Sequence, residues 1–360
     1  MKKKPVSEQV VVVTGGSAGL GRAIARAAAA RGAKVVVVTG ASAGLGRAIA
    51  RAAAARGASV VVAARGGDGL DAAVAELGPN AHAVQADVSS LDDCHRIVEE
   101  TIDRFGRIDT FCANAMVTVY QEARDLKPDE LRRVIDVNFL GAVNCYWASL
   151  QRLVESEGTF SHVNSALAYR GIPLQAAYCS SKAAARTFFE SARVEHEKHG
   201  IPVDITLVLP GAINTPQFDQ ARQYIGKQPQ PVPPIYEPEP YADAVLHTWE
   251  HPIRELPITW GAQKLLWGQK LSPRAGDLVL RRNGWKGQHT DEDKPVGSPD
   301  NLFEPLPGDK GARGRFSGKS RDSTLWTSLR LRRWLVGTAV VGVGLATMGV
   351  SSGRAKSLVH

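Results

Sequence analysis

The chain has 360 residues, of which 44% are hydrophobic and 22% are charged. These proportions are ordinary for a globular protein with a sizeable core, and they exclude a collagen, a largely disordered chain and a protein with many membrane spans. The four cysteines form no C-x-x-C pair, so we expect neither a disulfide framework nor a zinc ribbon, and no metal site. The expected compartment is a reducing cytoplasm.

The net charge of +8 is confined to the C-terminal end. Residues 311–360 hold nine Lys or Arg and one acid, so the preceding part of the chain is neutral overall. A neutral body gives no reason to expect nucleic-acid binding. The basic end indicates either an anionic membrane surface as partner or a solvated tail.

Two nearly identical segments open the chain. Residues 11–35 (copy one) and 36–60 (copy two) differ at only two positions. Each copy has the pattern of a buried valine strand, a glycine turn and an alanine-rich helix. Two copies are too few for a solenoid, so the near-identity indicates either a recent tandem duplication or an error in the gene model.

Apolar runs alternate with helical patterns further along the chain. We expect strands at 59–65, 81–87, 109–115, 159–165 and 203–209, and helices at 69–77, 91–105, 129–154 and 176–199. Continuous apolar strands separated by helices are typical of a parallel sheet covered on both faces. The predicted fold class is therefore α/β, a doubly wound (Rossmann-type) parallel sheet with helices on both faces.

The duplication conflicts with this fold. A strand–helix unit added before the first strand, with the same right-handed winding, would fall where strand 109–115 belongs. Copy two runs directly into strand 59–65, whereas copy one is terminal. We therefore expect copy one to leave the sheet and residues 1–35 to pack peripherally.

The C-terminal third is less regular. Residues 229–240 contain six prolines and predict either a stiff connector or, as we prefer, a lid over a substrate pocket. Residues 286–329 are expected to form an irregular basic extension. Residues 334–353 are uncharged, and a helix of that length reaches about 30 Å, so residues 330–360 are expected to be a membrane-associated tail rather than a flexible end.

A glycine-rich turn in copy two joins a strand to a helix. Glycines let the backbone approach a pyrophosphate, and the helix N-terminus supplies amide donors. The turn therefore predicts dinucleotide binding by Gly40, Ser42, Gly44, Leu45 and Gly46, and copy one repeats the device at Gly15, Gly19 and Gly21.

The end of strand 59–65 bears on the choice of dinucleotide. An acid at this point would bind the ribose 2′-hydroxyl of NAD, but the residue here is Arg65. An arginine can pair with a 2′-phosphate, which favours NADP over NAD. The alternative is a solvated arginine at a strand end.

A tyrosine and a lysine lie four residues apart in the helix expected at 176–199. This spacing places Tyr178 and Lys182 on one face, about one turn apart. An ammonium beside a phenol favours the phenolate, so we expect the lysine to lower the pKa of Tyr178 and make it a general acid or base. Ser165, at the end of strand 159–165, can polarise a carbonyl oxygen.

In motifs and their order, the chain resembles the short-chain dehydrogenase/reductase family over roughly residues 36–250. The matching elements are T-G-x-x-x-G-x-G at 39–46, Asp87-Val88, Asn114-Ala115, Asn138, Ser165, Tyr178-x-x-x-Lys182 and Pro210-Gly211-x-x-x-Thr215. The chain departs from the family at Met116, where a glycine is common. The narrower resemblance is to a bacterial subgroup with an extended C-terminus.

The resemblance implies a role for each matching residue. Tyr178 transfers the proton, Lys182 lowers its pKa and holds the nicotinamide ribose, Ser165 steadies the substrate oxygen, and Asn138 helps hold a water that relays protons to Lys182. Asp87 and Val88 border the adenine, Asn114 lies along the cofactor, and Pro210, Gly211 and Thr215 lie near the nicotinamide.

Together these expectations describe an NADP(H)-dependent oxidoreductase that interconverts a carbonyl and a secondary alcohol, with an apolar small-molecule substrate and a homo-oligomeric assembly. The catalytic domain is expected over 36–285. Two rival hypotheses stay open: a non-catalytic nucleotide-binding protein, and a membrane-tethered scaffold with the same fold.

Overall fold

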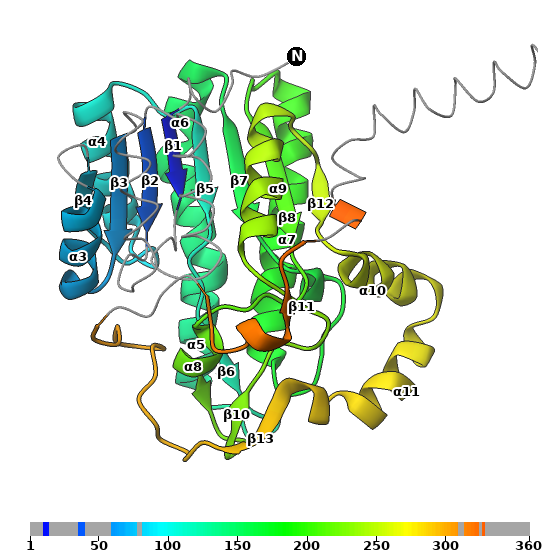
Figure 1. Ribbon diagram of the computed structural model, residues 1–360. Coiled ribbons are helices and arrows are strands. Elements are labelled where there is room, and N and C mark those ends of the chain that lie inside the picture. The colour runs from blue at the N-terminus through cyan, green and yellow to red at the C-terminus, as the bar shows by residue number, and fades with distance from the viewer. Residues whose placement is uncertain are drawn as a thin grey trace, which may run out of the picture.

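An eight-stranded parallel sheet forms the centre of the protein, in the order β12-β8-β7-β5-β1-β2-β3-β4 (Figure 1). The computed structural model describes residues 10–13, 35–39, 59–77, 81–308, 313–323 and 326–327. The strands are β1 (Val10–Val13), β2 (Val35–Thr39), β3 (Ser59–Ala64), β4 (Ala81–Gln85), β5 (Thr110–Ala113), β7 (Thr159–Val163), β8 (Asp204–Leu209) and β12 (Glu255–Pro257). The predicted fold class, a doubly wound parallel sheet, is confirmed.

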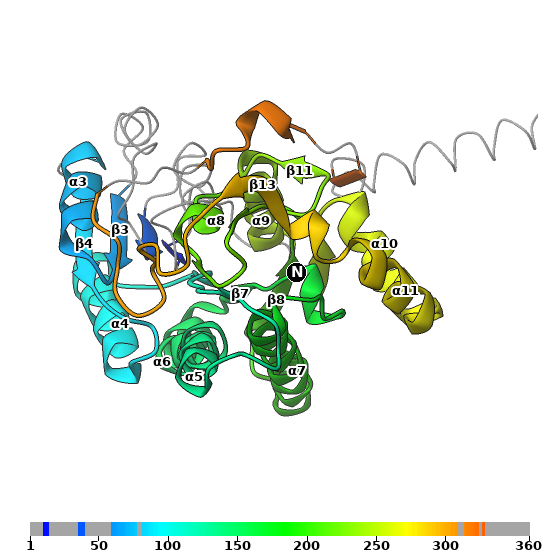
Figure 2. The ribbon, with the colours of Figure 1, turned by 90° about the horizontal axis from the view of Figure 1, so that it is seen from below.

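Helices cover the two faces of this sheet, with α4, α6 and α7 on one face and α9 on the other (Figure 2). The main helices are α3 (Gly67–Leu77), α4 (Leu91–Phe105), α5 (Pro128–Ile135), α6 (Gly141–Ser156), α7 (Ala176–His199), α9 (Glu239–Glu250), α10 (Trp260–Leu271) and α11 (Pro273–Asn283). The bounds of α4 and α7 are those that the sequence predicts.

Local sequence explains where α4 begins and ends. The Ser90 side chain accepts a hydrogen bond from the amide of Asp93, which caps the first turn. Gly106 ends the helix in the left-handed region, with φ of 77°. The buried side chains of α4, at helical spacing, are Cys94, Ile97, Val98 and Thr101.

Aromatic side chains fill the core beside the central strands. Phe111 of β5 and Phe160 of β7 are register partners, and their rings stack with centroids 6.0 Å apart. Tyr146 of α6 and Phe189 of α7 pack against Phe160 at 5.4 and 5.1 Å. These contacts fix α6 and α7 against the strands that lead to the candidate site.

The expectation that copy one leaves the sheet is wrong for its strand. β1 lies between β2 and β5, and its residues pair with the equivalent residues of copy two, Val11 with Val36 and Val12 with Val37. The sheet accommodates both copies by widening: β2, β3 and β4 follow β1 outward in chain order, so no two strands compete for one slot. The helices predicted for both copies lie outside the described residues.

The single helix expected at 129–154 is interrupted. A five-residue π-helical turn, η2 (Asp136–Leu140), separates α5 from α6. π-helical turns often mark functional sites, and this one carries the predicted site residue Asn138.

The C-terminal extension is more structured than the sequence predicts. β13 (His289–Asp293) pairs with β10 (Lys227–Pro229), and β14 (Ser320–Arg321) pairs with β11 (Ile235–Tyr236). Among the described residues, no helix has the length and apolar character needed to cross a membrane. Residues 334–353 lie outside the described part of the chain, so the membrane-associated tail stays a prediction.

Candidate active site

A cavity of about 550 Å³ lies at the carboxyl ends of the parallel strands. This edge of a doubly wound sheet is where such folds bind their ligands. Of the predicted site residues, the structure places Arg65, Asp87, Val88, Asn114, Ser165, Tyr178, Lys182, Pro210, Gly211 and Thr215 in its wall. Met116, which departs from the family pattern, is also in the wall. The predicted glycine-turn residues Gly40, Ser42, Gly44, Leu45 and Gly46 lie outside the described residues.

Ser165 and Tyr178 meet in this cavity. Ser165 follows β7 and caps a short 3₁₀ helix, where its Oγ accepts a hydrogen bond from the amide of Leu167 at 3.1 Å. The phenol of Tyr178, near the start of α7, lines the same cavity, and the Ser165 side chain is near enough to favour its ionised form. The serine can thus donate its own proton toward a substrate oxygen while the Leu167 amide holds its position.

Lys182 lies one turn further along α7 and is only 1% exposed. Its Nζ donates to the carbonyl oxygen of Val163 at 2.9 Å and lies 5.8 Å from the centroid of the Tyr178 ring. The predicted juxtaposition of the tyrosine and the lysine on one helix face is therefore present.

The protonation of this pair differs from the sequence prediction. Burial raises the pKa of Tyr178 to about 12, although the Ser165 side chain opposes the rise. Burial lowers the pKa of Lys182 to about 7. Because desolvation disfavours both the phenolate and the ammonium, the protein holds the phenol protonated at neutral pH instead of lowering its pKa.

Asn138 acts on the backbone around the site. Its Oδ1 accepts from the amide of Val117 at 2.8 Å, and its Nδ2 donates to the Val117 carbonyl at 2.9 Å and to Ser181 Oγ at 3.1 Å. Ser181 in turn donates to the carbonyl of Tyr178 at 2.8 Å. The implied water relay from Asn138 to Lys182 stays a prediction.

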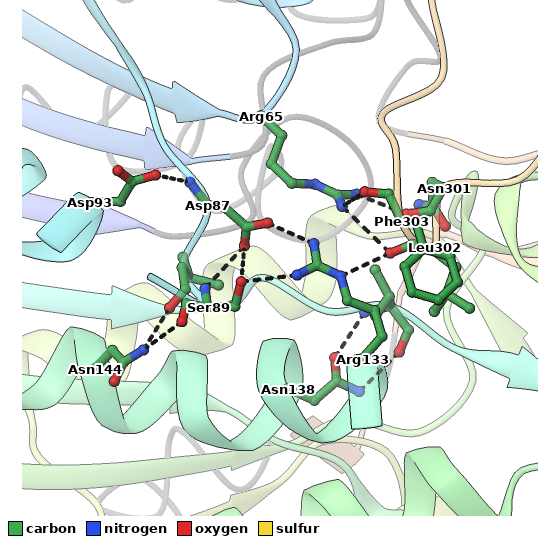
Figure 3. A network of polar contacts seen from close by, with 12 residues as sticks. Arg65, Asp87, Ser89, Asp93, Arg133, Asn138, Asn144, Asn301, Leu302 and Phe303 are labelled. Carbon is green, nitrogen blue, oxygen red and sulfur yellow. Dashed lines mark hydrogen bonds and ion pairs between the residues drawn. The ribbon is translucent and has the colours of Figure 1, made fainter. Parts of the chain in front are cut away.

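Arg65 lies in a polar network at the other end of the cavity (Figure 3). Its guanidinium donates to the carbonyl oxygens of Asn301 at 2.7 Å and Phe303 at 2.9 Å. Arg133 donates to Asp87 at 2.6 Å and to the carbonyl of Leu302 at 3.1 Å. Arg65, which the sequence predicts to pair with a 2′-phosphate, thus donates hydrogen bonds to the C-terminal extension in this structure.

Asp87 is held as a carboxylate by this network. Burial alone would raise its pKa, but hydrogen bonds from Arg133 and Ser89 outweigh burial and keep the pKa below its ordinary value. Arg133 was not among the sequence-predicted residues, because a single arginine on a predicted helix carries no spacing that points to a site.

Three further polar groups were missed by sequence reasoning. Thr118 Oγ1, Tyr120 OH and Asn164 Oδ1 are buried, belong to residues in the cavity wall, and have no hydrogen-bond partner among the described residues. A buried polar group without a partner carries a desolvation cost, which a bound ligand would relieve. Together with the charge of Arg65, these groups fit an extended, phosphate-bearing ligand such as a nicotinamide dinucleotide.

Comparison with known proteins identifies the family. A family model described as short chain dehydrogenase matches residues 34–225. The uncharacterized oxidoreductase YxnA of Bacillus subtilis (strain 168) is 35% identical over 344 residues, which cover 95% of this chain and 90% of that protein. The chain belongs to the short-chain dehydrogenase/reductase family. As a member of it, the chain is an NAD(P)-dependent dehydrogenase/reductase, and the resemblance inferred from its motifs is confirmed.

Other similar proteins cover less of the chain or show the fold alone. The 11-beta-hydroxysteroid dehydrogenase 1A of Arabidopsis thaliana is 39% identical over 156 residues, 42% of this chain and 43% of that protein. A short chain dehydrogenase from Burkholderia cenocepacia J2315, solved in complex with NADP, superposes with a TM-score of 0.60 at 24% identity, over 77% of this chain and 99% of that one. A 3-ketoacyl-(acyl-carrier-protein) reductase from Brucella melitensis, complexed with NADH, gives a TM-score of 0.55 at 21% identity, over 71% and 99%.

Proposed function

We propose that the protein reduces a carbonyl to a secondary alcohol, and catalyses the reverse reaction, with NADP(H) as cofactor and Tyr178 as the general acid or base. The observation that carries this proposal is the meeting of Ser165, Tyr178 and Lys182 in one cavity that also contains Arg65 and Asp87. A scaffold without catalytic activity would not need a serine and a tyrosine in one cavity wall beside a buried lysine.

The protein's own contribution to the reaction is proton transfer and orientation. The bound cofactor would supply or accept the hydride. The protonated phenol of Tyr178 donates its proton to the carbonyl oxygen as negative charge develops there, and the Ser165 hydroxyl donates a second hydrogen bond to the same oxygen. Lys182, held by the Val163 carbonyl, would bind the nicotinamide ribose and, when protonated, place positive charge beside the Tyr178 ring.

The cavity wall favours an apolar substrate. Its apolar side chains come from the segment before α7, from the elements after β8 and from the proline-rich segment, and include Ile172, Phe218, Val232, Leu265, Val279 and Leu280. Residues 230–234 lie in this wall, which supports the lid interpretation of the proline-rich segment over that of a remote connector. The plant relative named above acts on a hydroxysteroid, so bulky alcohols and ketones are the first substrates to test.

Replacing Tyr178 by phenylalanine tests the assignment. The ring and its packing remain while the transferable proton is lost, so we expect turnover to fall by roughly 10²- to 10⁴-fold with cofactor affinity retained. Turnover is measured with NADPH on a panel of apolar ketones, with Tyr224→Phe, which does not line the cavity, as the control. If Tyr178→Phe turns over like the unmodified protein, the proton donor is another group. A protein that binds NADPH but reduces nothing on the panel would favour the non-catalytic rival.

Replacing Arg65 by alanine tests the preference for NADP. No acid stands at the end of β3 to hold a ribose 2′-hydroxyl, and Arg65 contributes positive charge there. If its guanidinium exchanges a carbonyl partner for the 2′-phosphate, Arg65→Ala weakens NADPH binding at least ten-fold more than NADH binding. Fluorescence titration of both cofactors measures this ratio, and an equal loss of both affinities would leave Arg65 as a structural residue only.

A further inference from the structure

Residues 300–306, here called the strap, run across the end of the cavity near β3 and β4. The chain reaches this point after β13 and passes below α3 in Figure 1. Asn301, Pro305 and Leu306 of the strap line the same cavity as Arg65 and Asp87. A segment more than two hundred residues away from β3 in the sequence therefore forms part of the wall next to it.

Side-chain and backbone contacts hold the first three residues of the strap. Asp300 accepts a hydrogen bond from Arg222 Nε at 2.8 Å, and Asn301 pairs with Gln220 through both its amide and its side chain. Leu302 is fully buried in the main core cluster. Burial of a leucine side chain contributes about 1.5–3 kcal/mol, so this residue alone is a substantial anchor.

Two arginines of the body bind the strap through its backbone. Arg65 donates to the carbonyls of Asn301 and Phe303, and Arg133 to that of Leu302 (Figure 3). These carbonyls would otherwise need water or another donor. Arg65 follows β3, and Arg133 binds Asp87, which follows β4. The two arginines thus join the strap to the ends of β3 and β4, which border the adenosine half of the proposed dinucleotide site.

We propose that the strap is the adenosine-side wall of the cofactor site, fastened by Arg65 and Arg133, and that its outer part, residues 303–306, moves away from Gly66 when the cofactor enters and leaves. The proposal rests on the proposed nicotinamide dinucleotide site. It assigns to the C-terminal extension a part in retaining the cofactor, and to Arg133 a positioning role: it touches Asp87 and the strap rather than the reacting atoms.

The contact between Gly66 and Pro305 provides a direct test. A Cβ at Gly66 would lie 3.2 Å from the Cβ of Pro305, so a shift of a few tenths of an ångström brings the pair into the range of about 3.5–4.5 Å found in disulfides. The variant Gly66→Cys/Pro305→Cys can therefore be locked by oxidation, and the four native cysteines are buried. The two single-cysteine variants, treated alike, control for oxidation elsewhere.

Stopped-flow fluorescence measures NADPH exchange in the reduced and oxidised double variant. We expect oxidation after loading to slow NADPH release at least ten-fold, oxidation before loading to slow binding by a similar factor, and dithiothreitol to reverse both effects. Equal exchange rates in the two redox states would overturn the strap proposal. Failure of the reduced variant and of the unmodified protein to bind NADPH would instead overturn the proposed function.

A second variant loosens the strap without touching the cavity. Asp300→Ala removes the bond to Arg222, and neither residue lines the cavity. We expect release of NADPH and of NADH to accelerate by the same factor, at least five-fold, because the strap and not the 2′-phosphate is affected. Asp293→Ala, in the same extension but exposed and paired with Lys227, is the matched control. Release rates like those of the control would contradict the proposal.

Discussion

Lys182 shows how burial sets the chemistry of a single side chain in this site. The residue carries an amine into a region from which water is nearly excluded. Within the described part of the chain, its hydrogen bond is to a backbone carbonyl rather than a carboxylate. Burial therefore lowers its pKa to about 7. A cofactor ribose that accepts a bond from Nζ would favour the charged form, so binding and protonation are expected to be linked.

This burial predicts a pH-dependent contribution to stability. In the unfolded chain the lysine titrates near 10.5, so between pH 7 and 10.5 the unfolded state binds the additional proton. The cost of burying the protonated amine is paid in full below pH 7 and disappears toward pH 10.5. The free energy of unfolding therefore rises with pH by up to about 1.4 kcal/mol per pH unit in this window. We expect Lys182→Met to remove that rise. Urea denaturation at pH 7, 8 and 9 measures it against Lys227→Met, an exposed control; parallel pH profiles for the unmodified protein and Lys182→Met would refute the prediction.

At the scale of elements, the π-helical turn η2 links three parts of the site. Asn138 bonds both backbone groups of Val117 in the cavity wall and reaches α7 through Ser181, which holds the Tyr178 carbonyl. The amide is fully buried, so each of these bonds replaces one that water would otherwise make.

Removing this link predicts a loss of stability together with a loss of turnover. Asn138→Ala leaves the Val117 amide and carbonyl buried without their partner, at a cost of about 1–3 kcal/mol. We expect kcat to fall while the dissociation constant for NADPH changes little, because Tyr178 shifts and the adenosine end does not. Asn144→Ala removes a comparable buried amide from α6, bonded to the Val88 and Ser89 carbonyls, and should cost similar stability while retaining kcat. A kcat that falls equally in both variants would show a general effect of destabilisation.

Elements differ in how far the sequence could predict them. α7 was predicted at its observed bounds, and with it the meeting of Tyr178 and Lys182, because helical periodicity places residues four apart on one face. The strap was not predicted, since its bonds to Arg65 and Arg133 use backbone carbonyls, which any residue supplies. The protonation of the tyrosine–lysine pair was also missed, because spacing shows proximity but not desolvation.

At the scale of the whole molecule, the duplication puts two strands, β1 and β2, between β5 and β3. With a single copy, one strand and its glycine turn would adjoin both β5 and β3. β5, which leads to Asn114, is adjacent to β1 of copy one, whereas β3, which leads to Arg65, is adjacent to β2 of copy two. Neighbouring strands lie about 4.8 Å apart, so β1 and β2 each adjoin only one of the two strands that lead to these site residues. The prediction that copy one leaves the sheet assumed a fixed number of strands, and this assumption was wrong. A parallel strand can be added between two existing strands if it pairs with both of them.

The strand order also moves our expectation for the pyrophosphate site from copy two to copy one. Ligands of doubly wound sheets bind where the strand order reverses, which here is between β1 and β5. We therefore expect Gly19→Val/Gly21→Val to abolish NADPH binding and Gly44→Val/Gly46→Val to leave most of it. Deleting residues 11–35 leaves one turn adjacent to both β5 and β3, so binding should be retained or tightened. Fluorescence titration of the three variants with NADPH decides between the copies. Loss of binding only in the Gly44→Val/Gly46→Val protein would assign the site to Gly40, Gly44 and Gly46 instead. Loss of binding on deletion of residues 11–35 would mean that the widened sheet itself is required.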